Sequence, residues 1–136
     1  MLFKRTDGGR ADAGFKGKSG DCGTRAVAIY FQQPYRATYD KLGDVEAELT
    51  GGLCRSVRDG TGYPTLVAYM ALRKQALTVC KGAEYIHELP LKGRFLVVLA
   101  NHYATLIDNV WYDSWDSRYS KRTKHGGQKM LGYFHD

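Results

Sequence analysis

Residues 20–33 read GDCGTRAVAIYFQQ, and with them the chain changes abruptly from glycine-rich and polar to apolar. Cys22, Ala26 and Tyr30 recur at a spacing of four residues, and further apolar residues stand beside them. This periodicity predicts a helix that is apolar nearly all round and therefore buried. Pro34 ends the helix, because proline has no backbone N–H and disfavours helical conformation in the residue before it.

The remainder of the sequence predicts two more helices and then a sheet. The helices are expected at 39–49 and from 64 onward, and strands at 77–79, 94–100, 102–107, 110–115 and 131–134. Gly43 is a candidate break in the second helix. Helices that come first and an antiparallel sheet that follows indicate the α+β class.

Length and composition indicate one globular domain. The chain has 136 residues, of which 43% are hydrophobic and 25% charged, so wholesale disorder is excluded. No apolar run approaches the ~18 residues of a membrane span, and the first twenty residues lack a signal-peptide core. We expect a cytoplasmic protein with an irregular lead-in at 1–19, a single domain at 20–136 and a basic loop around 117–129.

The positive charge is concentrated at the two ends of the chain. The net charge is +6, with five Lys and Arg against two acids in residues 1–20 and five against one in residues 118–136. Such ends are either solvated or attract an anionic partner, such as nucleic acid, a cell-wall polymer or an acidic protein. Lys121, Arg122 and Lys124 are the candidate contacts.

The cysteines predict free thiols in a reducing compartment. Cys22, Cys54 and Cys80 are odd in number and contain no CxxC pair, which disfavours a disulfide framework and a structural zinc site. Cys22 stands where the buried helix begins. The free N–H groups and the positive dipole end of a helix stabilise a thiolate, so this position favours a nucleophilic thiol.

A predicted hairpin brings a histidine and an acid together. If Asp108-Asn109 is a two-residue turn, His102 faces Trp115, and Asp113 lies one diagonal step away on the same face of the sheet. A three-residue turn places Asp116 opposite His102 instead. We expect Asp113 to be the partner and keep Asp116 as the alternative.

A cysteine, a histidine and an acid are the groups that nucleophilic acyl transfer requires. The imidazole takes the thiol proton, the carboxylate orients the imidazole, and the thiolate attacks a carbonyl carbon. Each residue alone has an ordinary explanation, such as a buried small side chain or a solvated polar one. Their order along the chain and their places at a helix start and on a hairpin favour the catalytic interpretation.

These motifs resemble those of the papain-like cysteine peptidase superfamily. Asp21-Cys22-Gly23 is similar to the Asp-Cys-Gly of bacteriocin-leader peptidases attached to export transporters, and Asp113-Ser114-Trp115 resembles the Asn-Ser-Trp of papain. GDCGTRAVAI at 20–29 with HYATLIDNVWYDSWDS at 102–117 is also similar to small uncharacterised bacteriophage proteins.

The resemblance implies a papain-like fold and a phage-encoded peptidase or amidase that acts in the host cytoplasm. The substrate would be a protein, a peptide or a cell-wall amide, cleaved through a thioester, with no cofactor and no metal. Cys22 would be the nucleophile, His102 the general base and then acid, and Asp113 the orienting carboxylate. Trp115 would shield the imidazole from water.

The sequence departs from the papain pattern at the oxyanion hole. Papain-like enzymes carry an upstream glutamine that donates to the oxyanion, whereas no glutamine precedes Gln32 here. The backbone N–H of Cys22 supplies one donor, and Lys16, Lys18 and Ser19 are the candidates for a second.

Three other interpretations remain open. The chain could be an inactive papain-like module that binds a host protein or nucleic acid. Cys22, His102 and Asp113 are also zinc-ligand types, although their wide spacing disfavours a metal site. Cys54 stands near Arg55 and Arg58, whose charges favour a reactive thiol.

Overall fold

The computed structural model describes residues 1–16, 20–119 and 127–136. Within these ranges the protein is of the α+β class, with three α-helices, one short 3-10 helix and a six-stranded sheet. In chain order the elements are β1 (Leu2–Arg5), α1 (Cys22–Phe31), α2 (Tyr35–Leu49), α3 (Tyr63–Leu72), β2 (Ala76–Val79), η1 (Ile86–Glu88), β3 (Arg94–Leu99), β4 (His102–Ile107), β5 (Val110–Asp113) and β6 (Gly132–His135).

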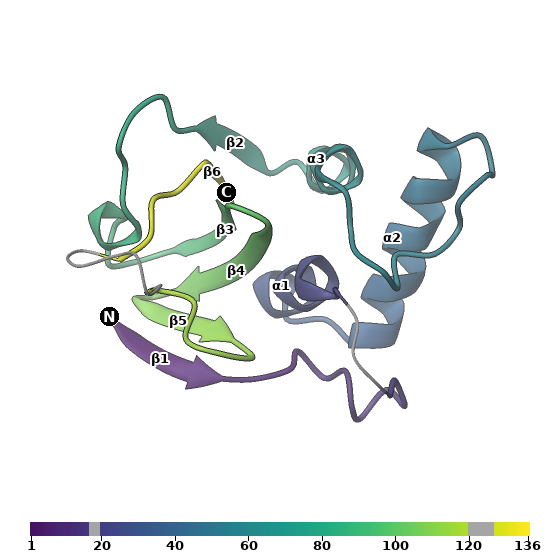
Figure 1. Cartoon of the computed structure of the whole chain (residues 1–136), viewed down its shortest axis with the longest axis horizontal. Helices are drawn as coiled ribbons and strands as arrows, with labels where there is room; N and C mark the ends of the chain where they lie inside the picture. The colour runs from purple at the N-terminus through teal and green to yellow at the C-terminus, as the bar shows by residue number, and fades with distance from the viewer. Residues whose placement is uncertain (17–19, 120–126) are drawn as a thin grey trace.

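The sheet has the strand order β1-β5-β4-β3-β6-β2. Its pairs are antiparallel except for β1 and β5, which run parallel. The helices gather on one side of the sheet, where α1 packs against β3, β4 and β5, while α2 packs on α1 and α3 on α2 (Figure 1). Helix α1 therefore makes most of the contacts between the helices and the strands.

The buried helix predicted from residue 22 is confirmed. Helix α1 spans Cys22–Phe31, and Ala26, Val27 and Tyr30 in it are each at most 1% exposed. The chain leaves the helix through Gln32 in a left-handed conformation, two residues before Pro34. The apolar periodicity is thus explained by contact with strands on one side and helices on the other.

Helix α2 differs from the prediction in its start and its continuity. It begins at Tyr35, directly after Pro34, and runs to Leu49 without a break at Gly43. A Cβ atom at Gly43 would lie 2.7 Å from the backbone carbonyl oxygen of Arg55. Glycine is required there because the segment after α2 returns across the helix, and not because the helix ends.

The prediction of an irregular lead-in at 1–19 is wrong for its first part. Strand β1 pairs with β5, and the N–H of Thr6 continues the contact by donating to the carbonyl oxygen of Asp113 at 2.8 Å. Further along, the ring centroid of Phe15 lies 5.0 Å from that of Tyr35 on α2. A short parallel pair depends on a partner far along the sequence, so local patterns do not reveal it.

Strand β3 is buried on both of its faces. Leu96 and Val98 join the apolar cluster beneath the helices, whereas Val97 and Leu99 join a second cluster that contains Trp111. A strand covered on both faces gives the continuous apolar run FLVVL at 95–99 rather than an alternating pattern. This strand is the rigid support against which β4 pairs along its full length.

Two further expectations concern the charged loop and the membrane. Most of the basic loop expected around 117–129, including Lys121, Arg122 and Lys124, lies outside the described residues. In the part of the chain that the structure covers, no helix combines the length and the apolar character needed to cross a membrane.

Candidate active site

Cys22 is the first residue of α1, and its side chain is half-buried against β4. Burial of the thiol raises its pKa, but hydrogen bonds with the His102 side chain and the Tyr103 backbone, and the charges of His102 and Arg25, lower it more. The net effect is a thiol pKa below the ordinary value of 9.0. The contact between the start of α1 and strand β4 thus favours the thiolate form of Cys22.

The first turn of α1, which carries Cys22, is packed closely against residues 59–61. A Cβ atom at Gly23 would lie 2.7 Å from the Cβ of Thr61 and 2.9 Å from its Oγ1. One at Gly20 would lie 3.2 Å from the carbonyl oxygen of Asp59. The glycines on both sides of the Asp-Cys pair therefore allow the 59–61 segment to press against the first turn of the helix.

His102 and Asp113 are brought together across the predicted hairpin. Nε2 of His102 lies 2.5 Å from Oδ2 of Asp113. Ile107 pairs with Val110, so the turn has two residues, and both of them have positive φ, as a type I′ turn requires. The expected register is confirmed, and with it the prediction that Asp113 lies on the side of His102.

The imidazole of His102 is held between an acid and a thiol. Burial lowers its pKa, but hydrogen bonds and charge from Asp113 and Cys22 outweigh burial and raise the pKa from 6.5 to about 9. Because Nε2 is occupied by Asp113, Nδ1 is the ring nitrogen that remains for Cys22. The lowered pKa of Cys22 and the raised pKa of His102 both favour a thiolate beside a protonated imidazole over the neutral pair.

Asp116, the alternative acid, is placed elsewhere. Its carboxylate accepts hydrogen bonds from Arg118, at 2.8 Å from Nε and 2.7 Å from Nη2, and it is 36% exposed. The pKa of this carboxyl is lowered first by its hydrogen bond with Arg118. The alternative is wrong for a physical reason: the two-residue turn sets the parity of the returning strand, and Asp116 lies beyond its end.

Ser117 completes a buried chain of hydrogen bonds that the sequence analysis missed. Its hydroxyl donates to Oδ2 of Asp113 and accepts from the indole N–H of Trp111 at 2.8 Å. The N–H of Ser114 donates to the other carboxylate oxygen at 2.7 Å. A buried tryptophan N–H needs an acceptor, and this requirement was the available signal for a polar residue near Trp111.

Trp115 lies over the imidazole, where the resemblance to papain places a shielding ring. The centroids of the His102 and Trp115 rings are 5.2 Å apart with an interplanar angle of 41°. The tryptophan is 47% exposed, so it forms part of the surface above the imidazole. One side of the His102 ring is therefore covered by an apolar group.

Asp21 and Arg25 form a second polar layer that the sequence analysis did not single out. Asp21 is 3% exposed and accepts hydrogen bonds from Arg25 and from the hydroxyl of Tyr35, the latter at 2.8 Å. Nε of Arg10 lies 3.3 Å from the same carboxylate. The i,i+4 spacing of Asp21 and Arg25 on a predicted helix was the signal that could have found the first pair.

The candidate donors for an oxyanion are the backbone N–H of Cys22 and the residues Lys16, Lys18 and Ser19. Lys16 is exposed, and its carbonyl oxygen accepts a hydrogen bond from Arg10 at 3.1 Å. Lys18 and Ser19 lie outside the described residues. The first backbone hydrogen bond of the helix runs from the N–H of Arg25 to Asp21, at 3.0 Å, so the N–H of Cys22 precedes the intrahelical ladder and is a donor for an oxyanion.

The other two cysteines have different surroundings. The Cys54 thiol donates to the carbonyl oxygen of Ser56 at 3.3 Å. Burial, followed by a hydrogen bond with Glu84 and the charges of Glu84 and Glu88, raises the pKa of Cys80 to about 12. Cys80 is therefore a poor nucleophile at neutral pH, and its environment is the opposite of that of Cys22.

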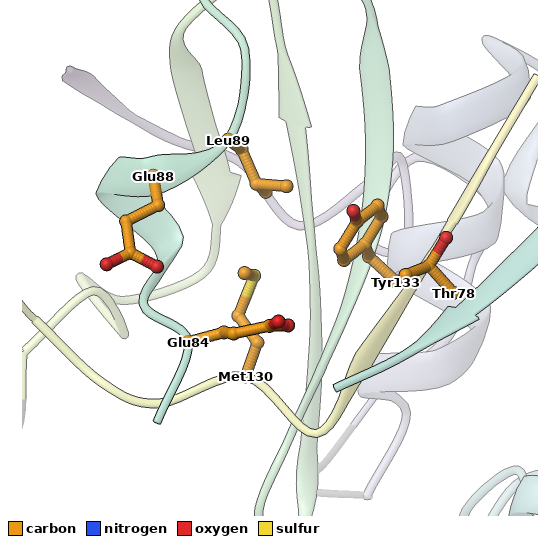
Figure 2. A pocket seen from close by; sticks show the side chains of 6 residues that line it. All are labelled: Thr78, Glu84, Glu88, Leu89, Met130 and Tyr133. Carbon is orange, nitrogen blue, oxygen red and sulfur yellow. The ribbon is translucent and has the colours of Figure 1, made fainter. Parts of the chain in front are cut away.

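The two glutamates near Cys80 line a pocket remote from the candidate site. The pocket has a volume of about 220 Å³ and is lined by Thr78, Glu84, Glu88, Leu89, Met130 and Tyr133. Figure 2 shows the two glutamates on one side of this hollow and Thr78 with Tyr133 on the other. None of the three proposed catalytic residues contributes to it.

Comparison of the chain with family models, curated proteins and solved structures finds no match. Within the described ranges, no three or more His, Cys, Asp and Glu side chains are grouped so that they could hold a metal ion. Cys22, His102 and Asp113 make a continuous chain of contacts from the start of α1 to the end of β5.

Proposed function

We propose that this protein is a papain-like cysteine peptidase or amidase that cleaves an amide bond through a thioester. The observation that carries the proposal is the placement of His102 between the Cys22 thiol and the Asp113 carboxylate. Nucleophile, base and orienting acid stand in the order that acyl transfer requires.

Asp113 suits the role of orienting carboxylate. Its side chain is 2% exposed, and both oxygens accept hydrogen bonds, so it holds Nε2 of His102 in one orientation. Nδ1 is thereby directed to the thiol. The fixed tautomer and orientation are what the third member of a catalytic triad contributes.

The reaction then follows from the ionised pair. The Cys22 thiolate attacks the carbonyl carbon, and the backbone N–H of Cys22 stabilises the oxyanion that forms. The C–N bond breaks as the His102 imidazolium gives its proton to the leaving amine, which leaves a thioester on Cys22. The neutral imidazole next takes a proton from water, which attacks the thioester carbonyl. The C–S bond breaks, the carboxylic acid leaves, and the thiolate and imidazolium of the starting state are restored.

The proposed substrates are proteins, peptides and cell-wall amides. In all three the bond cleaved is a secondary amide, whose leaving amine needs the proton that His102 carries. The raised pKa of His102, about 9, keeps that proton available at neutral pH. This match between the required acid and the observed environment supports an amide substrate.

The decisive experiment measures acyl transfer with a substrate that needs no specific pocket. We expect p-nitrophenyl acetate to give a burst of one p-nitrophenolate per protein and an acetyl group on the peptide that contains Cys22. Cys22→Ala should abolish the burst, whereas the matched control Cys54→Ala should retain it. A protein that is acetylated equally in both variants, or on neither, is not a cysteine hydrolase, and the binding-module interpretation then replaces this proposal.

A further inference from the structure

Arg25 stands between the two buried acids of the site. Its Nη1 donates to Oδ1 of Asp21, the residue before the nucleophile, and its Nη2 lies 3.6 Å from Oδ1 of Asp113. The side chains of Arg25, Asp21 and Asp113 are 13%, 4% and 2% exposed. One guanidinium therefore connects the start of α1 with the end of β5, which carry the nucleophile and the orienting acid.

The charges of the site balance only when Arg25 is included. With the thiol and the imidazole both ionised, the cluster has three anions and three cations: Cys22, Asp21 and Asp113, and His102, Arg25 and Arg10. A buried charge without a partner is costly. In the proposed reaction His102 loses its proton, and Arg25 is then the cation that remains beside Asp113.

Stability alone does not account for this arrangement. The Nε–H of Arg25 is buried and has no hydrogen-bond partner in the described part of the chain. An unpaired buried donor opposes folding, and buried ion pairs in general add little stability over apolar packing. The geometry instead suits a side chain that fixes two acids relative to each other, because a planar guanidinium presents donors in two directions.

The segment before α1 keeps Arg25 in place. A Cβ atom at Gly8, where φ is +70°, would lie 3.1 Å from the Cα atom of Arg25. Two residues earlier, the N–H of Thr6 donates to the carbonyl oxygen of Asp113, and two residues later Arg10 pairs with Asp21. The N-terminal segment thus contacts Arg25 and both of the acids that Arg25 connects, Asp21 and Asp113.

Other groups also face the thiol, and Arg25 differs from them in having a fixed charge. On β4 these are the imidazole of His102 and the backbone and phenol of Tyr103, and Tyr63 at the start of α3 lies near that phenol. Burial, followed by the charge of Cys22, raises the pKa of Tyr103, so its phenol stays protonated at neutral pH. Asp113 on β5 acts through His102.

We propose that Arg25 is a positioning residue that locks Asp21 and Asp113 together and supplies a permanent positive charge among the anions of the site. This inference rests on the proposed function and adds a fourth side chain to its machinery. Its role is exerted through Cys22 and Asp113, without contact with substrate.

The test measures the rate of alkylation of Cys22 by iodoacetamide as a function of pH, with peptide mapping. Loss of the cation destabilises the thiolate. In Arg25→Met the acid limb of the curve of alkylation rate against pH should therefore move upward by about one pH unit. At pH values below that limb, labelling of Cys22 should be about tenfold slower. Arg94→Met is the matched control. Arg94 binds the carbonyl oxygen of Tyr30 at the other end of α1 and pairs with Asp136, so the limb should stay in place.

A second variant separates charge from geometry. Arg25→Lys keeps the charge but loses the planar fork, so the acid limb should stay near its original pH while the p-nitrophenyl acetate burst slows about threefold to tenfold. This variant decides the matter even if Arg25→Met does not fold. Folded Arg25→Met with an unmoved limb, or Arg25→Lys with an unchanged burst, overturns the inference. A wild-type Cys22 that is labelled only on unfolding overturns the proposed function as well.

Discussion

His102 and Asp113 are separated by eleven positions in the chain, yet Nε2 of one lies 2.5 Å from Oδ2 of the other. The contact exists because Asp108 and Asn109 both adopt positive φ in a two-residue turn. Asn and Asp tolerate this conformation better than other residues with side chains, so the turn chemistry determines which acid reaches the histidine.

Replacing the two acids should affect turnover very differently. Asp113→Ala removes the group that orients His102, so turnover should fall by about 10²–10⁴-fold. Asp116→Ala breaks only the pair with Arg118 at the surface and should change turnover by less than about twofold. Steady-state rates with circular dichroism of both variants check this. Equal losses in two folded variants would contradict the triad assignment.

The three cysteines should differ in reactivity. At about pH 6 iodoacetamide should label Cys22 before Cys54 and Cys80, because the pKa of the Cys22 thiol is lowered and that of Cys80 is raised to about 12. His102→Ala should slow labelling of Cys22 and move its pH dependence upward, since a cation and a hydrogen bond are lost. Peptide mapping after partial alkylation measures all three sites. If His102→Ala leaves the rate unchanged, the two side chains do not form an ion pair.

The pH profile of turnover should have a plateau bounded by the ionisation of the Cys22 thiol and of the His102 imidazolium. Below the lowered pKa of Cys22 the thiol is protonated and turnover falls. Above about 9 the imidazolium of His102 loses the proton that the leaving amine needs, and turnover falls again. Asp113→Asn removes a charge that raises the pKa of His102, so the alkaline limb should move to lower pH. If the alkaline limb stays at the same pH in Asp113→Asn, the loss of turnover at high pH is due to the ionisation of a group other than His102.

A methyl group at Gly23 should destabilise the protein because of the contact with Thr61. Gly23→Ala places a Cβ atom 2.7 Å from the Cβ of Thr61, and we expect a loss of about 1–3 kcal/mol in the free energy of unfolding. Gly82→Ala is the control, because a Cβ atom there has no heavy atom within 4 Å and φ is not positive. Urea denaturation of both variants measures the difference. Similar midpoints would mean that the 59–61 segment yields to the added group.

The sequence alone predicted the elements whose pattern is local. The apolar period of residues 22–31, the proline after them and the Asp-Asn turn each act over a few neighbouring residues. These patterns were enough to place Cys22 at a helix start and to bring His102 and Asp113 together in the hairpin.

Only the tertiary structure decided the parts that depend on distant partners. Strand β1 needs β5, more than a hundred residues away, and the Arg25 bridge needs an acid on that same strand. Gly43 was predicted to be a break but is required by the approach of Arg55. The physical reason is the same in each case: the energy comes from pairing or close packing between segments that share no local pattern, so it appears only when the chain is folded.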